Sequence, residues 1–123
     1  RETMNPQRSR SLHKVFVYGT LKRGQRNFHY LQEAEFVGQF STESIYSMFV
    51  FEDYPAVCVD GQHAIHGEIY HVNDSQFRSL DELEWYPDFY QRIVIPTHHG
   101  DAWMYIVKAE LCDGKQQLHG MWP

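Results

Sequence analysis

Residues 15–25 read Val-Phe-Val-Tyr-Gly-Thr-Leu-Lys-Arg-Gly-Gln, and this stretch decides how the rest of the chain is interpreted. Its apolar first part predicts a β-strand that ends at Tyr18 and passes at Gly19 into polar, flexible chain. Glycine adopts backbone conformations that are closed to other residues, so successive N–H groups after the strand can converge on an anion. An ordinary exit from a strand into a loop gives the same pattern. The stretch therefore predicts either a backbone cradle for a small acid or a plain strand-to-loop turn.

Length and composition indicate a single globular domain. The chain has 123 residues, which is enough to bury a core but too few for two domains of ordinary size. The first residues are rich in Arg and Ser and lack apolar periodicity. We therefore expect a flexible N-terminal segment over residues 1–13 and one domain over residues 14–123.

Charge and hydropathy exclude several classes of partner. The formal net charge is −5, whereas nucleic-acid binding needs a basic surface that displaces counterions. No apolar run approaches the roughly 18 residues of a membrane-spanning helix, and no signal peptide is recognisable. Cys58 and Cys112 are too few and too far apart for a disulfide framework. We expect a cytoplasmic protein with reduced thiols and a small-molecule partner, and the sequence leaves its oligomeric state open.

The pattern of apolar and turn residues predicts many short strands and few helices. Asn27 is expected to cap a short helix through Glu33, and Asn73 to begin a longer helix from about Ser75 to Trp85. Strands are expected over residues 34–40, 44–50, 56–59 and 63–72, and a hairpin over residues 89–97 and 102–109. The order of elements predicts an α+β domain whose sheet curls into a small barrel.

One carboxylate falls on the apolar face of the longer helix. Successive helical residues turn by about 100°, which places Glu84 between Phe77 and Leu80 and points Glu82 away from them. A carboxylate that faces the interior must be paired or have a shifted pKa, and such groups gather at functional sites. Glu84 is therefore interpreted as a proton-transfer residue, as a structural ion-pair partner of Arg92, or as part of a fraying last turn.

Three segments together resemble the gamma-glutamylcyclotransferase-like family. They are residues 18–25 with Asn27, then Gly-Glu-Ile-Tyr at residues 67–70, then Leu-Asp-Glu-Leu-Glu-Trp-Tyr-Pro-Asp-Phe-Tyr-Gln-Arg at residues 80–92. The resemblance spans Lys14 to Ala109 in the right order, and it is strongest toward the gamma-glutamylamine cyclotransferase branch. The combination of segments is far more specific than any one of them.

The resemblance implies a fold, a reaction and a set of site residues. The expected fold is a small mixed β-barrel with flanking helices. The expected reaction converts an L-gamma-glutamyl amine or amino acid to 5-oxoproline and the free amine, without cofactor or metal. Glu84 would be the catalytic general acid/base. The gamma-glutamyl group would be bound by residues of the first loop and by one later tyrosine: Tyr18, Gly19, Thr20, Leu21 and Tyr90.

Some positions allow two interpretations. The family usually has glycine after the catalytic glutamate, and here Trp85 takes that place, where its ring would either narrow the pocket or pack outside it. For Tyr90 and Tyr105, a place in the aromatic core is as reasonable as contact with substrate.

Two other functions remain open. One is a non-catalytic binder of gamma-glutamyl or similar small acids on the same scaffold. The other is a histidine-metal regulatory module that uses His63 with His66, or His98 with His99, although the sequence has no metal-binding framework.

Overall fold

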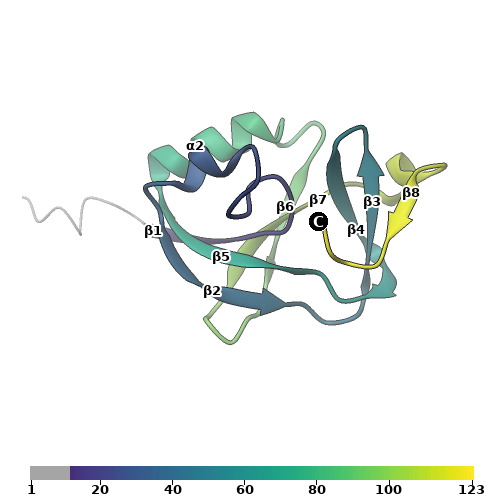
Figure 1. Cartoon of the computed structure of the whole chain (residues 1–123), viewed down its shortest axis with the longest axis horizontal. Helices are drawn as coiled ribbons and strands as arrows, with labels where there is room; N and C mark the ends of the chain where they lie inside the picture. The colour runs from purple at the N-terminus through teal and green to yellow at the C-terminus, as the bar shows by residue number, and fades with distance from the viewer. Residues whose placement is uncertain (1–11) are drawn as a thin grey trace, which may run out of the picture.

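The computed structural model describes residues 12–123, which form two β-sheets and one α-helix (Figure 1). The larger sheet contains β1 (Leu12–Val17), β2 (Glu35–Ser41), β5 (His66–Asn73), β6 (Gln91–Ile95) and β7 (Ala102–Ile106). The smaller sheet contains β3 (Tyr46–Phe51), β4 (Tyr54–His63) and β8 (Gln116–Leu118). The helix is α2 (Asp74–Leu83), and two single 3-10 turns are η1 (Phe28–Leu31) and η2 (Ala109–Cys112).

The strand that carries the first motif lies in the middle of the larger sheet. The strand order is β2-β5-β1-β7-β6, in which β1 is parallel to β7 and antiparallel to β5. Alternate side chains of β1 enter two different parts of the core: Val15 and Val17 pack with residues of α2, and Phe16 packs toward the other face. The end of β1 is thereby held at the centre of the molecule, where the loop after it begins.

The predicted α+β class is confirmed, but the predicted barrel is not closed. Residues 12–123 form a five-stranded and a three-stranded sheet with the separate orders β2-β5-β1-β7-β6 and β4-β3-β8. β4 is an edge strand that contains Pro55, and proline has no N–H with which to extend a ladder toward β7. The Val107 N–H donates to the Val57 carbonyl at 2.9 Å, which links the chain after β7 to β4 without closing the sheet.

Several predicted boundaries need correction. Leu12 and His13 belong to β1, so the predicted flexible segment over residues 1–13 is too long by two residues, and its remainder lies outside the described residues. The strand expected over residues 63–72 is divided, because His63 ends β4 and the chain crosses to the larger sheet before β5. β8 was not predicted, and the helix expected over residues 27–33 is only η1.

Helix α2 begins as the sequence predicts and ends two residues earlier. The Asn73 side chain accepts from the Gln76 N–H while the Gln76 side chain accepts from the Asn73 N–H, which is a complete capping box. At the other end Glu84 is the C-cap and Trp85 takes φ 55. The Trp85 N–H donates to the Glu82 carbonyl and the Tyr86 N–H to the Asp81 carbonyl, so the helix closes with a Schellman motif.

A partly buried ion pair fastens the last turn of α2 to the sheet. The Arg92 guanidinium on β6 donates through Nε and Nη2 to the two carboxylate oxygens of Asp81, both at 3.0 Å. The Tyr105 hydroxyl on β7 donates to Asp81 Oδ1 at 2.6 Å. The Arg92 guanidinium also lies 4.1 Å from the ring centre of Tyr86. Asp81 thus joins the helix to β6 and β7 directly beside Glu84.

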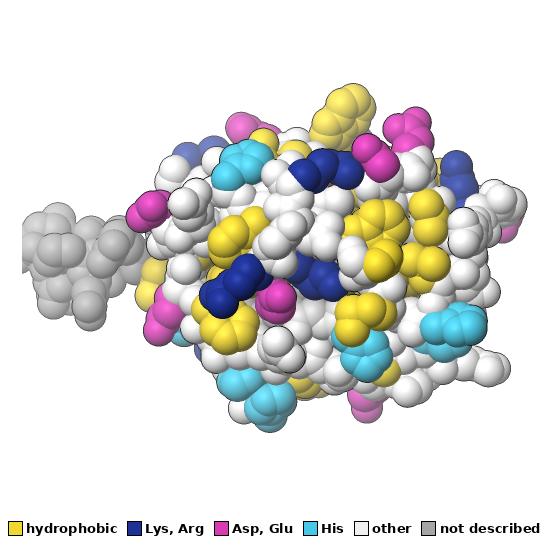
Figure 2. Space-filling view, viewed as in Figure 1, with side chains coloured by type: hydrophobic (Ala, Val, Ile, Leu, Met, Phe, Trp, Pro, Cys, Tyr) yellow, Lys and Arg dark blue, Asp and Glu magenta, His cyan; other side chains and the backbone are white. Residues whose placement is uncertain are grey.

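The surface has no dominant charge on the face shown in Figure 2, where basic and acidic side chains are interspersed. No helix in the described part of the chain is long and apolar enough to cross a membrane.

Replacing Asp81 by Asn should lower the free energy of unfolding by about 1–3 kcal/mol, because the amide cannot pair with the partly buried guanidinium. Chemical denaturation of the variant and the wild type measures this difference. The exposed neighbour Glu82 provides the control, since Glu82→Gln should change the value by no more than about 0.5 kcal/mol. Equal stability of Asp81→Asn and wild type would show that the ion pair does not hold the helix end.

Candidate active site

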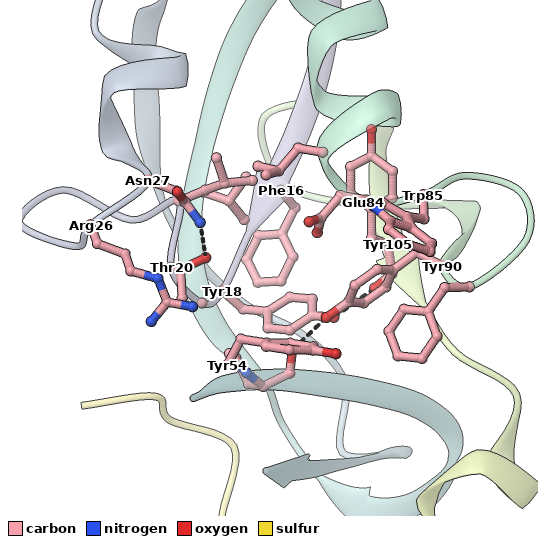
Figure 3. Close-up of a pocket in the computed structure, with 16 residues that line it drawn as sticks. Phe16, Tyr18, Thr20, Arg26, Asn27, Tyr54, Glu84, Trp85, Tyr90 and Tyr105 are labelled. Atoms are coloured by element: carbon pink, nitrogen blue, oxygen red, sulfur yellow. Dashed lines mark hydrogen bonds between the residues drawn. The ribbon is translucent and has the colours of Figure 1, made fainter. Parts of the chain in front are cut away.

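A cavity of about 370 Å³ lies where the loop after β1 meets the end of α2 and the start of β4 (Figure 3). The structure brings all six predicted site residues to its walls: Tyr18, Gly19, Thr20, Leu21, Glu84 and Tyr90. Its other lining residues are Phe16, Val17, Arg26, Asn27, Tyr54, Pro55, Leu83, Trp85, Phe89 and Tyr105. Segments that are distant in sequence therefore form one partly open cavity with many aromatic side chains in its walls.

The Glu84 carboxylate points into this cavity (Figure 3) and forms no hydrogen bond with any other described residue. The interpretation of Glu84 as an ion-pair partner of Arg92 is wrong, because the Arg92 guanidinium pairs with Asp81. Glu82 is exposed, as the helix periodicity predicts. Burial raises the pKa of Glu84 from 4.5 to about 7. Glu84 is thus an unpaired carboxyl that exchanges protons near neutral pH.

The Schellman motif fixes the backbone directly after Glu84. Trp85 has φ 55, a left-handed conformation that costs a non-glycine residue about 1–2 kcal/mol. This explains physically why glycine suits the position. The indole is 73% exposed and forms part of the cavity rim. Trp85 therefore neither fills the cavity nor packs into the core.

The loop after β1 lines the cavity and contains backbone N–H groups without acceptors in the described chain. Within residues 12–123, the N–H groups of Gly19, Thr20 and Leu21 donate to no other protein group. Their loop is closed by two bonds between its ends, Asn27 N–H to the Thr20 carbonyl at 2.9 Å and Asn27 Nδ2 to Thr20 Oγ1 at 3.0 Å. Asn27 stands at the N-cap position of η1 as expected, but its side chain makes no capping hydrogen bond and ties the loop together instead.

Gly19 is required by close packing rather than by a left-handed backbone, because its φ is not positive. A Cβ atom at Gly19 would lie 2.5 Å from Cγ of Pro55, which is shorter than real contacts allow. The ring of Pro55 is rigid and cannot move aside easily. Gly19 therefore lets β4 approach the loop and form one wall of the cavity.

Three of the four tyrosines that line the cavity, Tyr18, Tyr90 and Tyr105, direct their hydroxyl protons to other protein groups. Tyr18 donates to the Tyr105 carbonyl at 2.9 Å, Tyr90 to the Pro55 carbonyl at 2.6 Å, and Tyr105 to Asp81. Burial raises the pKa of Tyr18 and of Tyr90 well above the usual value. These residues shape the walls with their rings, and their hydroxyl oxygens can accept a hydrogen bond but have no free proton to give.

Sequence reasoning missed the walls contributed by Arg26, Tyr54 and Pro55. The strands expected over residues 44–50 and 56–59 leave Tyr54 and Pro55 between them, whereas these two residues begin β4. The Arg26 guanidinium donates to the Asp53 carbonyl at 2.9 Å and to its carboxylate at 3.1 Å. No local pattern marks these residues, because their place depends on how β4 packs against Gly19.

The histidines do not assemble a metal centre among the described residues, where no three His, Cys, Asp or Glu side chains are placed to hold an ion. His63 stacks on His119 with ring centres 5.1 Å apart, and His98 lies 4.0 Å from His99. The structure therefore gives the metal-module hypothesis no set of ligands in the part of the chain that it describes.

Comparison with known proteins agrees with the resemblance of the motifs. A protein of Vibrio cholerae named as a gamma-glutamylcyclotransferase candidate is 44% identical over 94 residues, which are 76% of this chain and 81% of that protein. Gamma-glutamylaminecyclotransferase A of Danio rerio is 41% identical over 90 residues, 66% of this chain and 56% of that protein. The crystal structure of a mouse AIG2-like protein has a TM-score of 0.74 at 28% identity, and the match covers 89% of this chain and 87% of that one.

These relatives support an enzyme of the gamma-glutamylcyclotransferase kind. Residues 15–123 match the family described as gamma-glutamyl cyclotransferase, AIG2-like, and the chain belongs to this family.

Proposed function

We propose that the enzyme converts an L-gamma-glutamyl amine or amino acid to 5-oxoproline and the free amine. The observation that carries this proposal is the placement of the unpaired Glu84 carboxyl in one cavity with the free N–H groups of Gly19–Leu21. The names of the relatives support the same substrate class. A carboxyl with a pKa of about 7 suits a reaction that moves protons at neutral pH.

The backbone donors would hold the carboxylate of the gamma-glutamyl group. Three N–H groups that point at one anion form a cradle whose geometry is set before the ligand arrives. The aromatic walls would keep the glutamyl chain bent, with its α-amine close to its own γ-carbonyl. Orienting two groups of one molecule in this way can remove roughly 7–11 kcal/mol from the barrier.

Glu84 would move the protons. Its ionised carboxylate takes a proton from the α-ammonium, and the freed nitrogen attacks the γ-carbonyl carbon to close the five-membered ring. The bond from that carbon to the leaving nitrogen then breaks as Glu84 returns its proton to the leaving amine, and the attacking nitrogen loses its second proton to solvent as the ring amide forms. A glutamate with its usual pKa lies about 3.5 units below an α-amine near 8, which costs about 5 kcal/mol. At a pKa of about 7 the gap shrinks to about one unit, or about 1.4 kcal/mol.

The departing amine would leave past the cavity rim. Trp85 and Tyr54 place aromatic surface there, and Arg26 adds a cation that Asp53 already neutralises. A rim of this kind contacts the leaving group rather than the glutamyl group, so it would set which amines are released efficiently.

The thiols support the proposed cytoplasmic location. Cys58 and Cys112 are buried and free, and burial raises the pKa of the Cys112 thiol to about 12. Such thiols are unreactive and suit a reducing compartment.

Glu84→Gln should abolish turnover while the fold and the affinity for a gamma-glutamyl ligand are kept. The amide has the same shape but cannot accept the ammonium proton, so the rate should fall by roughly 10²–10⁴-fold. Mass spectrometry of 5-oxoproline from a panel of L-gamma-glutamyl compounds measures the rate.

The matched control is Glu82→Gln, because Glu82 is two residues away on the exposed side of the helix. Its activity should equal that of the wild type. Near wild-type release of 5-oxoproline by Glu84→Gln would refute the role of Glu84. A wild-type protein that binds gamma-glutamyl ligands without turnover would instead be a non-catalytic binder.

Trp85→Gly should broaden the range of amines released, because it removes a bulky ring from the rim and leaves Glu84 in place. Glycine adopts φ 55 without strain, so the Schellman motif should persist. Initial rates for slim and bulky leaving groups test this. Identical substrate profiles of the two proteins would show that the indole does not meet the leaving group.

A further inference from the structure

The Lys-Arg-Gly-Gln part of the first motif does not reach into the catalytic cavity. The side chains of Lys22 and Gln25 are absent from its walls and contact residues from the far end of the chain instead. Lys22 Nζ donates to the Trp122 carbonyl at 2.7 Å, and Gln25 Nε2 donates to the Pro123 oxygen at 2.8 Å. We call residues 120–123 the strap. Figure 1 shows the chain returning from β8 to a point between the two sheets, where this segment lies.

The strap is itself fixed to the frame of the protein. The His66 N–H, at the start of β5, donates to the Gly120 carbonyl at 3.0 Å. Gly120 has φ +91, and a Cβ atom there would lie 1.9 Å from the Ala64 carbonyl oxygen, so only glycine fits. Trp122 packs against the core cluster that contains Phe16. The Trp122 carbonyl of the strap is thus held in place independently of the loop.

The loop is also held from the larger sheet. The Arg23 N–H donates to Glu68 Oε1 at 2.9 Å, and the same oxygen accepts from the Tyr70 hydroxyl at 3.0 Å. Glu68 and Tyr70 belong to the second motif, Gly-Glu-Ile-Tyr. The loop is therefore gripped between the sheet at Arg23 and the strap at Lys22 and Gln25.

A displacement of Lys22 would directly change the backbone geometry of the cradle formed by Gly19–Leu21. The Lys22 N–H donates to the Gly19 carbonyl at 3.1 Å, and the Gln25 N–H donates to the Lys22 carbonyl at 3.0 Å. The Gly19 and Thr20 carbonyls share peptide planes with the N–H groups of Thr20 and Leu21, and they accept from the N–H groups of Lys22 and Asn27. The directions of these cradle donors therefore depend on where Lys22 and Asn27 are held, and contacts that fix Lys22 support a preformed cradle.

We propose that Lys22 and Gln25 are positioning residues, which anchor the loop to the strap so that the N–H groups of Gly19–Leu21 point at the bound gamma-glutamyl group. The kinetic consequence rests on the proposed function, whereas the anchoring of the loop does not. The Lys-Arg-Gly-Gln part of the first motif would then serve ligand binding although the side chains of Lys22 and Gln25 do not contact the ligand.

The test replaces Lys22 by Met, which keeps the length of the side chain and removes the charged donor. KM for a gamma-glutamyl substrate should rise about tenfold while kcat stays within about twofold, because binding geometry is lost and Glu84 is untouched. Lys22→Arg should restore much of the affinity, and Gln25→Leu should raise KM in the same direction. Lys108→Met is the matched control, since Lys108 is exposed and its loss changes the net charge equally.

Amide hydrogen exchange provides a second readout that needs no substrate. The N–H groups of Lys22 and Asn27 close the loop and should exchange faster in Lys22→Met but not in Lys108→Met. Unchanged exchange, or an unchanged KM, would overturn the proposal. A Lys22→Met protein whose kcat and melting temperature fall together with its substrate affinity, and a Lys22→Arg protein that restores none of them, would also overturn it. If Lys22→Met exchanges faster but the wild type makes no 5-oxoproline, the anchoring of the loop by the strap is upheld and the proposed reaction is contradicted.

Discussion

The pairing of Arg92 with Asp81 is the interaction on which the candidate site depends. It fastens the last turn of α2 to β6 and directs the Arg92 guanidinium to Asp81 instead of Glu84. A glutamate beside a free guanidinium would keep a low pKa and would be a poor base. Because Arg92 pairs with Asp81, burial is the dominant influence on the pKa of Glu84 and raises it to about 7.

The site combines several local features that cost stability. Trp85 occupies a left-handed backbone conformation, Glu84 is a carboxyl without a partner among the described residues, and three N–H groups at Gly19–Leu21 lack acceptors there. Each feature is unfavourable by itself, and all of them surround one cavity. The buried strands β1, β5 and β7 hold this arrangement, since their core residues Phe16, Ile69 and Met104 are fully buried. Clustering of local strain around a cavity is what a binding or catalytic site requires.

Local rules were sufficient for the features that are set within a few residues. The helical period of about 100° correctly placed Glu84 inside and Glu82 outside, and the Asn73 capping box marked the start of α2. The strand-to-loop change at Tyr18 correctly marked the edge of the cavity. These features depend on neighbouring residues, so a single sequence contains them.

Features that depend on distant contacts could not be derived in this way. The reason for Gly19 lies in Pro55, which is 36 residues away in sequence and lay outside the predicted strands. The barrel prediction failed for a related reason, because whether β4 pairs with β7 is decided by packing between sheets. The hydrogen bond from Lys22 to the Trp122 carbonyl likewise joins residues that are 100 positions apart, so no local pattern indicates it.

The central claim is that Glu84 is a desolvated, unpaired carboxyl inside the cavity. Carbon-13 NMR of the glutamate side-chain carboxyls over a pH series tests it most directly, with the Glu84→Gln spectrum identifying the Glu84 signal. The account predicts a midpoint near 7, so that Glu84 is protonated in mildly acidic solution and becomes an effective base as the pH rises through neutrality. A midpoint near 4.5, the ordinary value, would show that the carboxylate is solvated or paired and would contradict the account.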